Sequence, residues 1–109
     1  MPPRSRDLVP GTLDLLILRS LSLEPMHGFG VSRRIEQISK GVFAVNPGSL
    51  LLAFQRLLRA DFVTAEWRLT ENGRRARYYA LTARGRKQLK VETEDWAARA
   101  GAITRLLRA

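Results

Sequence analysis

The 109-residue sequence contains no cysteine and a single histidine, His27. Without cysteine the chain forms no disulfide and holds no thiolate-bound metal, and this composition fits a reducing compartment. One histidine leaves few ways to assemble a catalytic triad or a zinc site. We therefore expect a protein that is not an enzyme and that uses no metal or cofactor.

Long apolar runs are also absent. The longest, Leu15–Leu18 and Leu50–Phe54, fall far short of the roughly 20 residues that cross a bilayer. The first residues, Met1–Asp7, are polar and precede no apolar segment of the kind found in secretion signals. The sequence therefore predicts no membrane contact and a cytoplasmic location.

Acidic residues are scarce relative to basic ones. Ten Asp and Glu stand against 19 Lys and Arg, which gives a formal net charge of +9. Clustered positive charge predicts a polyanionic partner. Between residues 68 and 90 the only acid is Glu71, whereas residues 92–95 are mostly acidic. The basic residues of the first stretch are Arg68, Arg74, Arg75, Arg77, Arg84, Arg86, Lys87 and Lys90.

A hydrophobic content of 45% in a chain of this length predicts one folded domain. The spacing of the apolar residues predicts two helices in the first part of the chain. The first begins at Thr12, its expected cap, and ends before Pro25 because the residue preceding a proline avoids the helical region. The second extends from about His27 to Ser39. His27 is expected to cap or pack at its start, and Gly41 fits the left-handed position that closes it.

A third helix is predicted from Asn46, a capping residue, and Pro47, which suits the first helical position. A very short strand is expected just before it, at residues 43–45. One face of this helix is apolar and comprises Leu50, Phe54, Leu57 and Leu58. Another face comprises Ser49, Leu52, Ala53 and Arg56, flanked by Gln55 and Arg59.

The hydrophobic period changes to that of strands at residues 62–69 and 77–81. Asn72–Gly73 between them predicts a hairpin turn. Adjacent side chains of a strand point to opposite faces, so at least one of Tyr78 and Tyr79 is expected in the core. A last helix follows, and its apolar residues include Leu89, Val91, Trp96, Ile103, Leu106 and Leu107.

This order of elements predicts a mainly α fold with a small β-hairpin (α+β), namely a winged helix-turn-helix with a C-terminal dimerisation helix. We expect a flexible N-terminal arm over residues 1–10, a DNA-binding domain over 11–82 and the dimerisation helix over 83–109. A helix of about 25 residues cannot bury its apolar stripe on so small a domain alone. Pairing with a second copy also places two recognition helices about one DNA turn apart.

Four segments, taken in order, carry a resemblance to a known family: Pro10–Leu18 with Pro25–Gly30, Val45–Leu50, Asn72–Thr82, and Gly85–Arg86. Together they resemble the PadR family of bacterial transcriptional regulators, specifically its short-armed members of the acidobacterial type. The resemblance covers about residues 8–107. It implies a dimeric winged-helix repressor with the third helix in the major groove and the wing on the flanking DNA backbone.

The resemblance implies DNA contacts from the third helix and from the wing. On the helix it implicates Ser49 and Arg56, to which we add Leu52 and Gln55 from the same region. On the wing it implicates Asn72, Gly73, Arg74, Arg75, Arg77 and Tyr79.

The third helix departs from the family at Leu51–Leu52, where the family usually has a Tyr-Pro pair. The Tyr of that pair commonly contacts the DNA backbone, so its loss removes one phosphate contact. Leu52 is expected to meet a thymine methyl group instead.

Trp96, together with Ile103 and Leu106, is expected at a homodimer interface. In some members of the resembled family, a tryptophan on this helix lines a cavity between subunits that takes planar apolar ligands. The resemblance thus also implies a planar apolar effector as a candidate partner. The small residues at 97, 98 and 100–102 favour close helix packing over an open cavity.

The sequence predicts a homodimeric, sequence-specific repressor that binds double-stranded DNA at a pseudo-palindromic operator. The alternative is a dimerising protein-interaction module that kept the winged-helix fold and lost specific DNA reading, and Leu51–Leu52 is its best support. A membrane-surface binder is disfavoured because the basic hairpin has no apolar helical face beside it.

Overall fold

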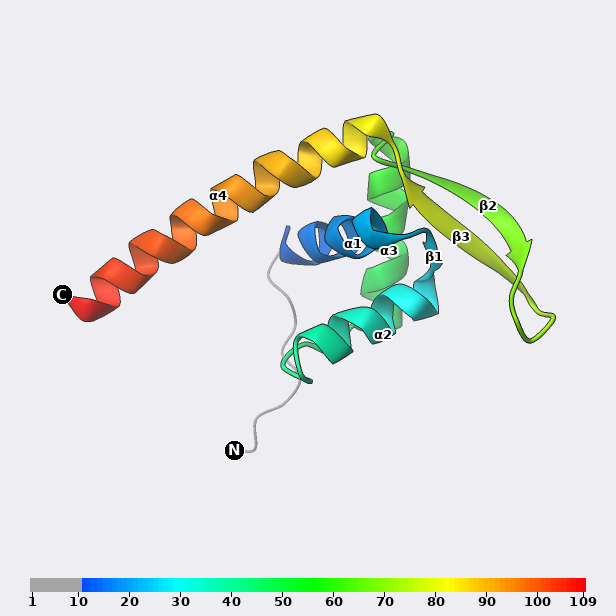
Figure 1. The fold of residues 1–109 in the computed structure, drawn as a ribbon, viewed down its shortest axis with the longest axis horizontal. Coiled ribbons are helices and arrows are strands. Elements are labelled where there is room, and N and C mark those ends of the chain that lie inside the picture. Colours follow the sequence, from blue (N-terminus) through cyan, green and yellow to red (C-terminus); the bar gives the residue numbers. More distant parts are fainter. Residues whose placement is uncertain (1–10) are drawn as a thin grey trace.

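The computed structural model describes residues 11–109 as four helices and a three-stranded antiparallel sheet (Figure 1). This confirms the predicted α+β winged helix-turn-helix architecture. The expected N-terminal arm, residues 1–10, lies outside the described residues. The elements in chain order are α1 (Thr12–Leu23), β1 (Met26–His27), α2 (Gly28–Ile38), α3 (Pro47–Arg59), β2 (Val63–Leu69), β3 (Arg75–Leu81) and α4 (Ala83–Arg108).

The first helix, α1, supplies the centre of the core but begins differently from the prediction. Gly11, with φ 91°, occupies the N-cap and makes no side-chain cap, while Thr12 is already helical. The expectation that Thr12 caps this helix is therefore wrong, because a backbone turn with positive φ, which glycine tolerates, starts it instead. The helix ends at Leu23, before Pro25 as predicted. Its buried apolar residues are Leu13, Ile17, Leu18 and Leu21.

The third strand of the sheet is β1, and not residues 43–45 as the sequence suggested. β1 pairs antiparallel with β3, so that Met26 lies opposite Tyr79 and His27 opposite Tyr78. Residues 43–45 form an irregular connection in which Phe43 and Val45 pack against the core. A run of three apolar residues fits both a strand and a packed connection, and only the presence of a pairing partner distinguishes them.

The helices α2 and α3 begin with the capping side chains that the sequence predicted. His27 Nδ1 accepts a hydrogen bond from the backbone N–H of Gly30 at 2.9 Å. Asn46 Oδ1 accepts bonds from the N–H groups of Gly48 and Ser49 at 2.8 and 3.2 Å. Each capping atom accepts hydrogen bonds from backbone N–H groups of the first turn, which have no partner within the helix.

The apolar face of α3 is wider than predicted. Leu50, Phe54 and Leu57 are buried as expected, but Ala53 is also fully buried. Its assignment to the outward face is therefore wrong. A small side chain at this position lets the helices of the core approach closely, which the helical period alone does not reveal.

The wing is the hairpin of β2 and β3, which pair from Val63 opposite Leu81 to Leu69 opposite Arg75. The second strand therefore starts two positions earlier than predicted and lengthens the wing. Its turn contains Gly73 at φ 75°, and it is closed by a bond from the N–H of Thr70 to the carbonyl oxygen of Arg74 at 2.7 Å.

The start of α4 is fixed against the base of the wing. Thr82 Oγ1 accepts a hydrogen bond from the N–H of Gly85 at 2.9 Å and donates one to the carbonyl of Asp61 at 2.6 Å. Gly85 is buried, and a Cβ on it would lie 2.0 Å from the carbonyl oxygen of Phe62. Only glycine fits this position.

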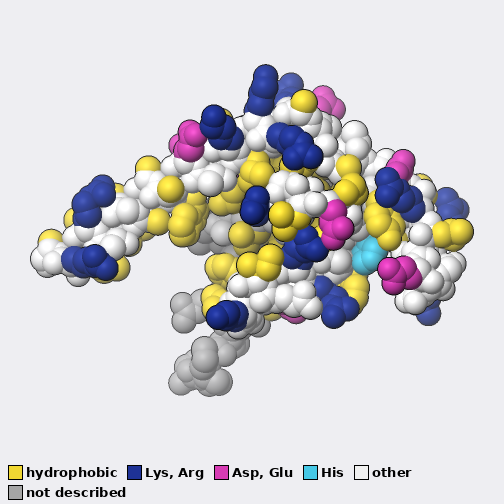
Figure 2. All heavy atoms as spheres, viewed as in Figure 1, with side chains coloured by type: hydrophobic (Ala, Val, Ile, Leu, Met, Phe, Trp, Pro, Cys, Tyr) yellow, Lys and Arg dark blue, Asp and Glu magenta, His cyan; other side chains and the backbone are white. Residues whose placement is uncertain are grey.

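Beyond its first turns α4 leaves the core and projects away from it (Figure 1). Leu89 still packs against the core, whereas later apolar residues are exposed. Figure 2 shows hydrophobic side chains along the projecting part of this helix. The exposed ones are Val91, Trp96, Ile103, Leu106 and Leu107. Among the described residues, no helix combines the length and apolarity needed to cross a bilayer.

Candidate nucleic-acid interface

All four residues of α3 that the sequence singled out are exposed. Ser49, Leu52 and Gln55 are all exposed, and Leu52 leaves 57% of its surface in water. The opposite face of α3 is anchored in the core, and Asn46 fixes the start of the helix. The side chains on the outward face therefore project from a rigid element.

Arg56, the fourth of these residues, is tied to α1. Its Nη2 lies 2.7 Å from Oδ1 of Asp14, and this hydrogen bond raises the pKa of the Arg56 guanidinium. The two residues are separated by 42 positions in the sequence. Sequence reasoning missed Asp14 because no local pattern links residues so far apart.

Asp14 also lies near the acidic part of α4. Burial, followed by the charges of Asp14 and Asp95, raises the pKa of Glu92, against an opposing hydrogen bond from Gln88. Asp14 of α1 thus binds the guanidinium of Arg56 on α3 and also influences the carboxyl group of Glu92 on α4.

The wing presents exposed cationic side chains near its turn. Arg74, Arg75 and Arg77 are exposed, together with Asn72 and Gly73. The guanidinium of Arg75 lies over the ring of Trp67, 5.3 Å from its centroid. Such a contact restricts the arginine while leaving its N–H groups accessible. Trp67 is 60% exposed, and no pattern in the sequence indicates this contact.

The resemblance implies that Tyr79 contacts DNA from the wing, but the structure places this side chain in the core. It is 6% exposed, and its ring stacks on that of Phe54 with 3.8 Å between centroids. Tyr78 points to the other side of the sheet, where it meets His27 edge-on and lies under Arg68. The expectation that at least one of the two tyrosines is a core residue is confirmed. Tyr79 is not accessible to a DNA backbone in this structure.

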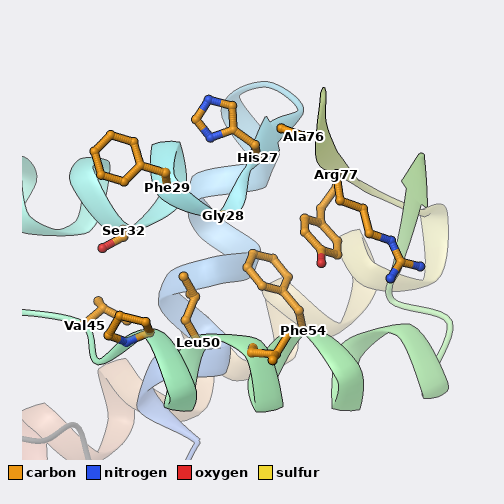
Figure 3. Close-up of a pocket in the computed structure, with 12 residues that line it drawn as sticks. His27, Gly28, Phe29, Ser32, Val45, Leu50, Phe54, Ala76 and Arg77 are labelled. Carbon is orange, nitrogen blue, oxygen red and sulfur yellow. The ribbon is translucent and has the colours of Figure 1, made fainter. Parts of the chain in front are cut away.

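The N-terminal half of α3 and the strand β3 lie side by side. They share a cavity whose lining includes Leu50 and Leu51 from the helix and Ala76 and Arg77 from the strand (Figure 3). Exposed Leu51 of α3 and exposed Arg77 of the wing therefore border the same cavity.

The two ends of the molecule thus expose different kinds of side chain. Exposed polar, apolar and cationic side chains gather around α3 and the wing, while the far end of α4 exposes Trp96, Ile103 and Leu106 to 53%, 56% and 75%. A buried three-helix core, an exposed third helix and a basic hairpin define this chain as a winged helix-turn-helix protein of the class found in transcriptional regulators.

Within that class the chain belongs to the PadR-like family of transcriptional regulators, whose model matches residues 17–91. A transcriptional regulator from Clostridium thermocellum is 25% identical and superposes with a TM-score of 0.82, over 94% of this chain and 96% of that one. A PadR-like transcriptional regulator from Bacillus cereus, 22% identical, shares the fold with a TM-score of 0.78, over 91% and 94% of the two chains.

A protein from Lysinibacillus sphaericus, described as uncharacterized protein X, is 28% identical over 91 residues, which make up 84% of each chain. The family and the solved neighbours are transcriptional regulators and not enzymes, in agreement with the expectation from composition.

Proposed function

We propose that this protein is a homodimeric, sequence-specific DNA-binding repressor. The observation that carries the proposal is an exposed face on α3 together with an exposed cationic wing in the same small domain. An α-helix fits the major groove of B-DNA, where base edges are distinguishable. A wing with several guanidinium groups fits the neighbouring phosphates. The repressor acts by occupying an operator and blocking transcription.

In this proposal the two elements have different roles. Ser49, Leu52 and Gln55 influence the choice of sequence, with Leu52 against a thymine methyl group. Arg74, Arg75 and Arg77 supply salt-dependent affinity that depends little on sequence, and the backbone of Asn72 and Gly73 shapes the turn that presents them. Arg56 influences the choice of sequence only when its guanidinium leaves Asp14 and donates hydrogen bonds to an acceptor on DNA.

The proposed dimer forms through α4, residues 83–109, while residues 11–82 bind DNA. The exposure of Trp96, Ile103 and Leu106 supports this division, because an apolar stripe on a helix normally packs against a partner. A two-fold dimer matches a pseudo-palindromic operator. The location that fits such a regulator is the cytoplasm. A planar apolar effector between the Trp96 residues of the two subunits belongs to the same proposal.

The deciding experiment compares the affinity for a duplex from the gene's own upstream region with that for random DNA of equal length. At physiological salt we expect a preference well above about tenfold, because specific sites exceed non-specific binding by much more than that. Equal affinity for both duplexes contradicts specific reading. That outcome favours a protein-interaction module, in which exposed Leu51 and Leu52 contact another protein.

A further inference from the structure

The outer part of the wing extends beyond the helices of the core (Figure 1). Along β2 the exposed fraction of the apolar side chains rises from 3% at Val63 to 60% at Trp67 and 70% at Leu69. The core therefore makes little use of the indole of Trp67, which lies beside the cationic side chain of Arg75. We infer that Trp67 is a positioning residue, whose ring holds the guanidinium of Arg75 ready for a DNA phosphate. The inference rests on the proposed DNA-binding function.

The two faces of the wing differ in charge. Side chains alternate along a strand and paired residues point to the same side, so the face that carries Trp67 also carries Arg75 and Arg77. Within the paired parts of β2 and β3, this face has no acidic residue. The opposite face carries Glu66, whose carboxylate pairs with the guanidinium of Arg68. A DNA phosphate is therefore attracted more strongly to the face of Trp67 than to the other face.

The face of Trp67 is also the side of the sheet on which α3 lies. Tyr79, which belongs to this face, stacks on Phe54 of α3 with 3.8 Å between the ring centroids. Nearer the turn, Arg77 of the same face borders the cavity that Leu51 of α3 also borders. A duplex bound along α3 therefore lies on the side of the wing that carries Trp67.

The contact between Trp67 and Arg75 runs diagonally across the hairpin. Arg75 is opposite Leu69, two positions nearer the turn than Trp67, and its guanidinium lies 5.3 Å from the centroid of the indole. Aromatic and long side chains reach each other over such diagonals. No carboxylate in the part of the chain that the structure describes forms an ion pair with Arg75. The ring therefore restrains this arginine while its N–H groups stay available to a phosphate.

A restrained arginine binds a phosphate more tightly than an unrestrained one. The arginine side chain has several rotatable bonds, and fixing them on binding lowers the affinity. Because the indole of Trp67 already limits the conformations of Arg75, less conformational entropy is lost when DNA arrives. From the usual cost of immobilising one long side chain, we expect loss of the ring to weaken DNA binding by about two- to tenfold.

A double-mutant cycle tests this role, with fluorescence anisotropy of a labelled random-sequence duplex at low salt as the measure of affinity. Trp67→Leu keeps an apolar strand residue but removes the ring, and should weaken binding by about two- to tenfold. When Arg75→Ala is already present, the same substitution should have no further effect, because the guanidinium that the ring holds is gone. Trp67→Phe keeps an aromatic face and should retain affinity that Trp67→Leu loses.

Arg68 and Tyr78 provide the matched control on the opposite face of the same hairpin. The guanidinium of Arg68 also lies 5.3 Å from the centroid of an aromatic ring, that of Tyr78. This pair is on the side of the sheet away from α3, so a cycle of Arg68→Ala and Tyr78→Leu should show no coupling in DNA affinity. Circular dichroism and thermal melts establish that the variants of both cycles are folded.

Equal weakening by Trp67→Leu with and without Arg75 would overturn the inference, because the indole would then act independently of the arginine. Unchanged affinity in Trp67→Leu would overturn it as well. Equal coupling in the two cycles would overturn the assignment of the DNA-facing side of the wing. In each of these cases the wild type still binds DNA, and the proposed function stands. A wild-type protein that binds no DNA at low salt contradicts the proposed function itself, and the inference with it.

Discussion

The arginine side chains of this protein differ in whether they form an ion pair with a carboxylate. Arg34 pairs with Glu24 and Arg56 with Asp14, while Arg68 contacts Glu66. Over residues 11–109, no such ion pair involves the wing arginines 74, 75 and 77. The wing therefore offers its charge without first breaking an internal contact.

Replacing Arg74 and Arg75 together by Ala should reduce the salt dependence of DNA binding. Each phosphate contact contributes about 0.9 to the slope of log affinity against log salt, so the slope should flatten by up to about 1.8. Fluorescence anisotropy at several salt concentrations measures it. The matched control is Arg105→Ala with Arg108→Ala at the far end of α4. An unchanged slope in the wing variant would refute the phosphate contacts.

Asp14→Asn tests whether Arg56 is held back from DNA. The substitution removes a carboxylate beside α3 and frees the guanidinium, so we expect tighter DNA binding and a slope steeper by up to about one unit. Stability should change by only about 0–1 kcal/mol, since the Arg56 side chain is 52% exposed and water screens the pair, although Asp14 is only 21% exposed. Glu24→Gln, which frees Arg34 on α2, is the control. Weaker binding by Asp14→Asn would show that the ion pair positions α3 rather than restrains Arg56.

Among the elements, the joint between the wing and α4 tolerates the least change. Gly85→Ala should destabilise the fold by about 1–3 kcal/mol or more, because its Cβ would collide with the backbone of Phe62. Gly101→Ala on the same helix is the matched control, since its Cβ would meet only the flexible end of Arg105 at 3.5 Å. Alanine there should raise stability by up to about 1 kcal/mol. Urea unfolding of both variants checks the contrast, and equal stabilities would contradict the tight joint.

The elements that the sequence predicted best are those with local signals. Asn46 and Pro47 start α3 and Asn72–Gly73 forms the hairpin turn, because each acts on backbone groups a few residues away. The third strand was misplaced for the opposite reason. Met26–His27 becomes a strand only through pairing with Tyr78–Tyr79, about half the chain away.

At the scale of the whole molecule, the projecting part of α4 leaves an apolar stripe that a single chain does not cover. Ile103→Asp should disrupt the proposed dimer, because a carboxylate buried in an apolar interface is strongly unfavourable. Size-exclusion chromatography with light scattering should find a dimer for the wild type at tens of micromolar and a monomer for the variant.

Ala98→Asp provides the matched control for this prediction. It adds the same charge to an exposed position on α4, but the helical period of 3.6 residues places it on the side away from Trp96 and Ile103. It should leave the dimer intact. A wild-type protein that is monomeric at these concentrations would contradict the role of α4.

The sequence by itself determined the winged-helix architecture, the family, the concentration of basic charge from Arg68 to Lys90 and the caps of α2 and α3. The family follows from the resemblance of four sequence segments, whereas the other properties depend on composition, on hydrophobic period and on contacts between near neighbours in the chain. The tertiary structure decided which side chains are accessible. It placed Tyr79 against Phe54, joined Arg56 to Asp14 and left a cavity between α2, α3 and β3. Each of these outcomes requires segments distant in sequence to meet in one geometry, which no local pattern specifies.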